Sequence, residues 1–253
     1  MVYCVAVRAW GPRGEDSLAI DYDDPFQGYQ KEYVNVTYAL GSTVTREMYE
    51  DDQYNYINGI PRMLAKSLRQ TEETIGHNHF NRAFNASFTG ADGATLCSAT
   101  HNLVGGGSFR NQLAVPADLT QTSLEQAIQD LMDWVDDRSL KIRIMPKTLL
   151  VPTQLNFTAR KLLETDYVVG SADNDKNPIP GLFQDLVVSP YLTDTDAWFI
   201  VTDCDDGMVW YNRRNAELNR DNEFDTQNLK FATTRRFSSS WTNPRGVFGT
   251  AGA

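Results

Sequence analysis

The stretch INGIPRMLAKSLRQTEETIGHNHFNRA (residues 57–83) determines the interpretation of the surrounding chain. Its apolar side chains recur at spacings of three, four, four and seven residues: Ile57, Ile60, Leu64, Leu68 and Ile75. These spacings place them on one face of a 3.6-residue period. We therefore expect a long helix over residues 45–83, with a boundary or kink at Pro61 in the first turn of its main segment.

The chain before this helix has a different pattern. Residues 10–28 (WGPRGEDSLAIDYDDPFQG) combine turn-forming residues with Trp10, Tyr22 and Phe26 and have no helical period. Residues 29–40 alternate apolar and polar side chains, which predicts a half-buried strand. Together the two stretches predict a long projecting loop or hairpin, and loops of this length in compact domains are usually functional.

The chain after the helix alternates loops, helices and strands. A Gly-rich loop is expected over residues 85–118. It precedes an expected helix at 123–135, which Thr122 or Ser123 can cap. The remaining expected elements are a strand at 148–151, a helix at 153–164, and strands at 185–189, 197–202, 208–212 and 228–237. The fold class predicted from this pattern is α+β.

Composition excludes several classes of protein. The 253 residues are 41% hydrophobic and 22% charged, which is ordinary globular usage. No apolar run is long enough to span a bilayer, and the apolar start lacks the flanks of a signal peptide. The net charge is −10 and no basic stripe is visible, so tight sequence-specific binding to nucleic acid is not expected. A soluble protein is expected.

Three cysteines, Cys4, Cys97 and Cys204, form an odd and unpatterned set. Without a C-x-x-C pair, neither a zinc site nor a redox pair is supported. We expect three free thiols in a reducing compartment.

The motifs that could support chemistry are weak. The tripeptide at residues 77–79 shares its letters with a nuclease motif, but its members lie together on the expected helix. The segment 173–184 begins like a calcium loop, yet it has Pro178 where Gly is required and Gln184 where Glu is required. A third cluster could hold a divalent metal, although a solvated turn is the simpler interpretation: Asp203, Asp205 and Asp206. No catalytic, cofactor-binding or metal site is predicted.

Five longer stretches resemble one family in the order in which that family has them. They are TREMYEDDQY (45–54), GADGATLCSATHNLVGG (90–106), LLVPTQLNFTARKLL (149–163), LVVSPYLTDTDAWFIVTD (186–203) and FDTQNLKFATTRRFSSSWTNPRGVFGT (224–250). The chain resembles the major head (capsid) subunits of tailed bacteriophages related to the Mu-like head protein.

The resemblance implies a Hong Kong 97-like capsid fold. Its parts would be a short N-terminal arm (1–9), an extended β-hairpin loop (10–40), a peripheral domain (41–118 and 204–253) with a spine helix (45–83), and an axial domain (119–203). Many related subunits have a longer arm, or a scaffold segment that a protease removes, before the loop.

The resemblance also implies the function. The chain would be a non-enzymatic major capsid protein that self-assembles into an icosahedral head around double-stranded DNA, as hexameric and pentameric capsomers. Portal, scaffold, protease and cement proteins are candidate partners, and packaged DNA would be contacted non-specifically. The protein would be found in the virion after assembly in the bacterial host cytoplasm. Candidate contacts between subunits are Trp10, Asp21, Tyr22, Phe26, Arg46, Glu47 and Glu50.

Two alternatives come from other classes of protein. One is a carboxylate-metal hydrolase that uses the aspartates at 203–206, and the other is an accessory (decoration) head protein. Size in solution separates the three: an enzyme stays small, a decoration protein binds preformed shells, and a shell protein builds capsomers or particles.

Overall fold

The computed structural model describes residues 2–4, 27–167 and 175–253. The chain divides into two compact units. Unit 1 comprises residues 1–32, 79–208 and 241–253, and unit 2 comprises residues 33–78 and 209–240. The chain therefore passes between the units four times. The predictions for residues 5–26, including Trp10, Asp21, Tyr22 and Phe26, lie outside the described residues.

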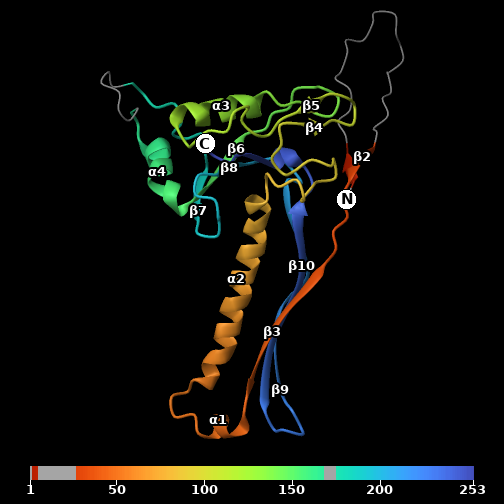
Figure 1. Ribbon diagram of the computed structural model, residues 1–253, viewed down its shortest axis with the longest axis vertical. Helices are drawn as coiled ribbons and strands as arrows, with labels where there is room; N and C mark the ends of the chain where they lie inside the picture. Colours follow the sequence, from red (N-terminus) through yellow and green to blue (C-terminus); the bar gives the residue numbers. More distant parts are fainter. Residues whose placement is uncertain (1, 5–26, 168–174) are drawn as a thin grey trace, which may run out of the picture. The chain divides into compact units, whose positions relative to one another are not determined.

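Unit 1 is organised by a four-stranded mixed sheet in the order β11-β8-β6-β7 (Figure 1). Its strands are β6 (Pro146–Pro152), β7 (Asp185–Ser189), β8 (Trp198–Thr202) and β11 (Val247–Thr250). β6 pairs with β7 in parallel and with β8 antiparallel, and β8 pairs antiparallel with β11. The other elements are β1 (Val2–Cys4), β2 (Gln27–Gln30), β4 (His101–Asn102), β5 (Ser108–Phe109), α3 (Gln121–Met132), the 3₁₀ turn η2 (Thr153–Leu155), α4 (Asn156–Glu164) and the 3₁₀ turn η3 (Pro244–Gly246).

The core of unit 1 lies on both faces of this sheet. One cluster joins α3 and α4 to the sheet, and its central side chains are fully buried: Leu124, Leu131, Leu149, Trp198, Ile200 and Phe248. A second cluster packs around Phe199, whose ring lies 5.3 Å from Phe80 and 6.0 Å from Phe84. Full burial of a large apolar side chain contributes ~1.5–3 kcal/mol, so unit 1 has an extensive core of its own.

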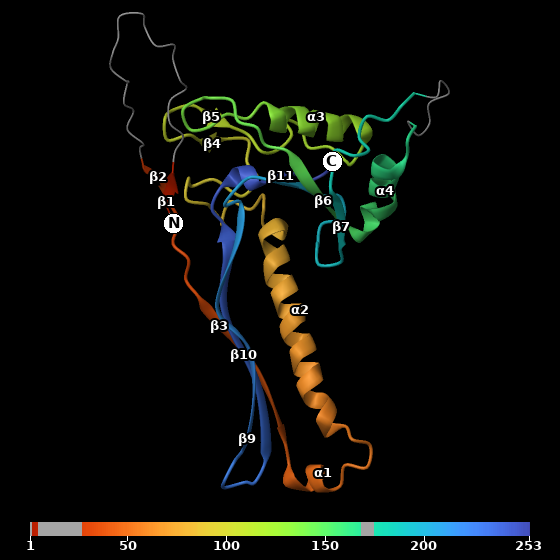
Figure 2. The same cartoon turned by 180° about the vertical axis from the view of Figure 1, so that it is seen from behind.

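Unit 2 consists of a three-stranded antiparallel sheet and a long helix (Figure 2). Its elements are β3 (Val36–Val44), α1 (Arg46–Glu50), the 3₁₀ turn η1 (Ile57–Gly59), and most of α2 (Ile60–Asn81), β9 (Met208–Asn222) and β10 (Leu229–Trp241). The strand order is β3-β10-β9, with Leu229 opposite Val44 and Phe237 opposite Val36. Its buried cluster is small: Val44, Ile57, Ile60, Leu64, Leu229 and Phe231.

An ion pair connects α2 to the sheet of unit 2, and aromatic contacts join the three strands of that sheet. The Glu72 carboxylate, only 7% exposed, pairs with Arg235 on β10. The Phe237 ring stacks between Trp210 at 4.4 Å and Tyr38 at 4.8 Å, so all three strands contribute to one aromatic column.

The expected helix at 45–83 was wrong in its first part. α1 and α2 are separated by residues 51–59, because the Asp52 carboxylate accepts hydrogen bonds from Tyr56 N (3.0 Å) and Ile57 N (2.9 Å). An aspartate that binds backbone N–H groups a few residues onward favours a turn over a continuing helix. Asn55, at φ 57°, completes that turn, and Pro61 lies in the first turn of α2 as predicted.

Other element boundaries also differ from the expectation. The expected strand at 29–40 is two strands, β2 and β3, because the chain passes from unit 1 to unit 2 between residues 32 and 33. α3 is capped by Thr120, whose Oγ1 accepts from Ser123 N while Ser123 Oγ accepts from Thr120 N. β9 continues to Asn222, ten residues beyond its expected end.

Candidate interaction surface

Arg46, Glu47 and Glu50 lie together on α1, a single exposed turn of helix in unit 2. Thr45 caps this helix through Oγ1, which accepts from Met48 N at 3.3 Å. Arg46 Nε donates to Glu50 Oε1 at 2.7 Å, and the Glu50 carboxylate raises the pKa of the Arg46 guanidinium. Arg46 also donates to the side chain of Gln227, which connects α1 to the turn between β9 and β10.

The turn between β9 and β10 is held by Glu223. Its carboxylate accepts from Thr226 Oγ1 at 2.7 Å and from Lys230 Nζ at 2.8 Å, and both bonds lower the pKa of Glu223. Gln227 adopts φ 55°, a left-handed conformation uncommon for residues other than glycine. The same turn leaves the Phe224 side chain 95% exposed.

Between α1 and this turn lies an open groove of about 590 Å³. It is lined by Arg46, Tyr49, Glu50, Arg220, Asn222, Glu223, Phe224, Gln227 and Leu229. The Arg220 guanidinium lies 6.0 Å from the Tyr49 ring and 5.8 Å from the Phe231 ring. The groove therefore combines aromatic walls with charges of both signs, a composition suited to contacts between proteins.

Large apolar side chains gather around the same end of unit 2. Those at least half exposed include Met48, Tyr49, Tyr54, Tyr56 and Phe224. A single exposed aromatic side chain is normal on a protein surface. A cluster of such side chains beside a groove marks a surface that another molecule covers. We call the groove and these side chains the α1 surface.

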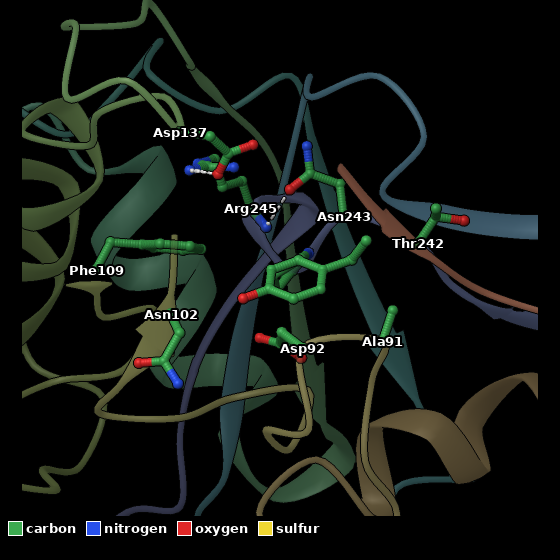
Figure 3. Close-up of a pocket in the computed structure, with 10 residues that line it drawn as sticks. Ala91, Asp92, Asn102, Phe109, Asp137, Thr242, Asn243 and Arg245 are labelled. Atoms are coloured by element: carbon green, nitrogen blue, oxygen red, sulfur yellow. Dashed lines mark hydrogen bonds and ion pairs between the residues drawn. The ribbon is translucent and has the colours of Figure 1, made fainter. Parts of the chain in front are cut away.

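A second hollow lies in unit 1 and is much smaller, about 30 Å³ (Figure 3). Figure 3 shows Arg245 reaching both Asp137, at 3.4 Å, and the side chain of Asn243, which accepts from Arg245 N at 3.1 Å. Arg245 Nε donates to Val135 O at 3.1 Å, and its guanidinium lies 4.3 Å from the Phe109 ring. A volume of this size holds a water molecule and no organic ligand.

The walls around this hollow are joined by a fully buried polar network centred on Asn111. The two hydrogens of its Nδ2 are shared among three carbonyl acceptors: Leu96 O (2.7 Å), Pro244 O (3.0 Å) and Val247 O (3.0 Å). Its Oδ1 accepts from Ser98 N at 2.8 Å and also faces His101 Nε2 at 3.0 Å. The amide orientation is thereby fixed, so the Nε2 position of His101 donates a hydrogen bond to Asn111. The network joins segments that lie far apart in the sequence.

The second nitrogen of His101 completes this network. Nδ1 lies 2.5 Å from Asp92 Oδ2, and both side chains are almost fully buried. Every polar atom of the ring therefore has a partner within the protein, as expected for a residue that holds loops together.

The weak motifs gain no chemistry from the structure. Asp203 accepts a backbone hydrogen bond from Met145 N at 2.8 Å, and Asp205 and Asp206 lie in the turn that follows β8. Within the described ranges, no group of three or more histidine, cysteine or acidic side chains is arranged to hold a metal ion. The 77–79 tripeptide lies on α2, as predicted. Asp173, the first residue of the calcium-like loop, lies outside the described residues.

Two thiols can be placed. Cys97 is fully buried, which raises its pKa, and burial raises the pKa of Cys204 to about 11; both are free. Thiols held protonated in this way are poor nucleophiles. The side chain of Cys4 lies outside the described part of the chain. No helix in that part is long and apolar enough to cross a membrane.

Formal charge is distributed unevenly between the two units. Unit 2 contains ten basic and ten acidic residues, whereas unit 1 contains thirteen basic and twenty-three acidic residues. The whole net charge of −10 therefore belongs to unit 1. Copies of unit 2 can approach one another without net repulsion, whereas copies of unit 1 repel.

Sequence reasoning found only part of the α1 surface. Of the contact residues expected from the sequence, Arg46 and Glu50 line the groove and Glu47 lies beside them on α1, whereas Tyr49 and Phe224 were not among the expected residues. A signal for Phe224 does exist, because it is the single apolar residue in the turn DNEFDTQN (221–228). An apolar side chain placed among turn-forming residues has no core to enter.

Comparison with known proteins reveals one family. Residues 28–249 match the model of a family described as phage capsid protein. No relative was found among curated protein sequences.

Solved structures of low sequence identity share the fold. The capsid of Ralstonia phage GP4 is 14% identical, with a TM-score of 0.62 over 100% of this chain and 83% of that chain. The capsid of the native GTA particle is 12% identical, with a TM-score of 0.58 over 100% and 84%. A structure from Mycobacterium phage Che8 is 12% identical, with a TM-score of 0.54 over 98% and 83%.

Proposed function

This chain belongs to the phage capsid protein family and is a major capsid protein with a Hong Kong 97-like fold, and we propose that its copies form the hexameric and pentameric capsomers of an icosahedral shell around double-stranded DNA. In this proposal the α1 surface is one of the contacts between copies. The observation that carries this proposal is the position of a 95% exposed Phe224 beside a groove lined by Tyr49 and Arg220.

A projecting side chain next to a groove suits assembly of identical subunits. In a head-to-tail contact, a knob on one copy enters a groove on the next, and such contacts close into rings when the rotation permits. Aromatic and arginine side chains dominate the binding energy of interfaces when water is excluded from them. The Arg46–Glu50 pair at the rim would add orientation and little affinity, because it is exposed on both sides.

We assign the domains of the family fold to this chain as follows. The spine helix is α2, beginning at Ile60, and with the sheet β3-β10-β9 it belongs to the peripheral domain. Residues 119–203 form the axial domain, and residues 84–118 complete the peripheral domain. Supporting this assignment, α3 and α4 pack on one cluster of the sheet in unit 1, although the compact unit also includes residues 84–118.

The charge distribution supports a role for unit 1 at the inner wall. A unit whose acidic residues outnumber its basic residues by ten repels phosphate, so DNA packed against it would slide without binding. Assembly in the bacterial host cytoplasm agrees with the free thiols of Cys97 and Cys204. Portal, scaffold, protease and cement proteins remain candidate partners of the shell. A non-enzymatic role agrees with a family of structural subunits.

The test is the substitution Phe224→Ser, with Phe157→Ser as the matched control. Phe157 is 77% exposed on α4 of unit 1, so both changes remove an exposed ring. We expect Phe224→Ser to raise the protein concentration needed for particle formation by ~30-fold or more, as for a hot-spot residue. Its melting temperature should equal that of the wild type.

Negative-stain imaging and sedimentation measure the outcome. Wild-type protein that stays monomeric under varied salt and pH, with and without scaffold, would contradict the shell. If Phe224→Ser forms particles as well as the wild type, the proposed shell stands, but the α1 surface is not one of its contacts between subunits.

A further inference from the structure

The sheet of unit 2 has two edges, and these differ in chemistry. Among the described residues, β3 pairs only with β10, so one side of its nine residues has no strand beside it. β9 forms the opposite edge. An unpaired edge presents backbone N–H and C=O groups that can pair with another chain, and proteins normally protect such edges with charges, proline or bulges.

The β9 edge is protected in this way. Its outer half contains charged side chains of both signs: Arg213, Arg214, Glu217, Arg220 and Asp221. All residues from 212 to 222 are exposed, so these charges remain in water. A strand that approached this edge would have to desolvate them.

The β3 edge has no such protection. Its sequence, VTYALGSTV, has no charge and no proline, and it pairs with β10 in unbroken register from Val36 to Val44. Val36 and Leu40 lie on the same face of the strand and remain 48% and 51% exposed. In a monomer this composition favours aggregation, so its retention indicates that a partner covers the edge.

The chemistry of the edge selects a polypeptide as that partner. Backbone amides at strand spacing pair with an extended chain, and alternate side chains such as Val36 and Leu40 provide apolar contacts to it. A nucleic acid would require basic residues, which β3 lacks. Unit 2 has no net charge, so a second copy can bring its own unit 2 close without repulsion.

We propose that the free edge of β3 accepts an extended strand from a neighbouring copy of this chain, so that the sheet of unit 2 continues across the boundary between subunits. This inference rests on the proposed shell, because only an assembly holds a second copy beside every β3. The contact is made by backbone hydrogen bonds, and it is separate from the α1 surface.

Hydrogen exchange of assembled particles, compared with unassembled subunits, tests the proposal directly. In an antiparallel strand, neighbouring residues direct their N–H groups to opposite edges. We expect alternate amides of Val36–Val44 to exchange ~100-fold or more slowly after assembly, while amides at the outer edge of β9 keep their rates.

Proline substitutions at neighbouring positions provide a second measurement. We compare Ala39→Pro with Leu40→Pro. One of these two variants removes an N–H group that bonds to β10, and it should have a lower melting temperature. The other removes the outward N–H, which should leave the melting temperature unchanged and prevent assembly. The pair Asn215→Pro and Ala216→Pro on β9 is the matched control, and its outward-facing member should assemble normally.

The outcomes separate this inference from the proposed shell. Wild-type particles whose β3 amides gain no protection would overturn the inference and leave the shell intact. Normal particles from both β3 proline variants would overturn it as well. A wild-type chain that never assembles would overturn the shell and the inference together.

Discussion

Units 1 and 2 are stabilised by different kinds of interaction. In unit 1, polar groups between distant segments are satisfied by an uncharged side chain, Asn111, whose amide lies within hydrogen-bond distance of five internal partners. In unit 2, the helix is tied to the sheet by a charged pair, Glu72–Arg235, around a core of six side chains. Asn111 thus satisfies buried polar groups of unit 1 internally, whereas unit 2 has a groove and, among the described residues, an unpaired strand edge.

The largest effect is expected from Asn111→Leu in unit 1. Leucine fills a similar volume but removes the Asn111 donor from the carbonyls of Leu96 and Val247 and the acceptor from Ser98 N, whereas Pro244 O keeps the Val247 N–H. Each buried unsatisfied polar group costs ~1–3 kcal/mol, so we expect a loss of about 4 kcal/mol or more in the free energy of unfolding. Thermal denaturation of unassembled subunits should show a fall of roughly 10 °C.

Asn102→Leu is the control for this change, because Asn102 is exposed on the neighbouring strand β4. It should melt within ~2 °C of the wild type, as expected for a surface substitution. If Asn111→Leu and Asn102→Leu have the same melting temperature, the polar network around Asn111 does not hold the loops of unit 1 together.

A smaller effect is expected from Arg235→Met in unit 2. The change leaves the Glu72 carboxylate buried without its main partner, which costs ~3 kcal/mol. Arg69 lies 3.5 Å from Glu72 and is largely exposed, so it compensates in part. The free energy of unfolding, measured in urea, should fall accordingly.

The double variant Glu72→Met with Arg235→Met sharpens this test. With both charges replaced by apolar side chains, most of the lost stability should return. The Arg235 guanidinium also lies 5.6 Å from the Phe237 ring. A double variant as unstable as Arg235→Met would show that the arginine acts through this ring contact and not through the pair.

The smallest effect is expected from Asp52→Asn at the turn before α2. Backbone hydrogen bonds from Ile57 and Tyr56 lower the pKa of the Asp52 carboxyl. Its stabilisation is therefore present above the ordinary aspartate pKa and is lost as pH falls through the lowered value in the folded protein. We expect a slightly lower melting temperature at pH 7 and a difference that disappears once the pH is below the lowered pKa of Asp52 in the folded protein. A difference that persisted in acid would contradict this assignment.

The parts of the fold that sequence predicted are those where an apolar period reports burial directly. Ile57, Ile60 and Leu64 are buried as their spacing indicates. The break at 51–59 was missed because it depends on one carboxylate and two backbone amides. The outer half of β9 was missed because its residues are exposed on both faces, so pairing with β10 alone makes it a strand.

The polar network around Asn111 and the α1 surface are harder to predict from the sequence. Asn111 contacts groups from Leu96 to Val247, and no local pattern links those positions. Arg46 and Glu50 were found through family resemblance, whereas Gln227 joins them only because β3 and β10 pair in space.

The pairing of β3 with β10 also has a consequence for biosynthesis. Val36–Val44 emerge from the ribosome roughly 190 residues before their partners on β10. At ~5–20 residues per second, translation takes about 10–40 s to supply them. During that interval an uncharged strand has neither of its edges paired, at a time when many nascent copies share one cell. The number of subunits available for a head is therefore decided partly during translation, in a race between completing each chain and aggregation of the unfinished ones.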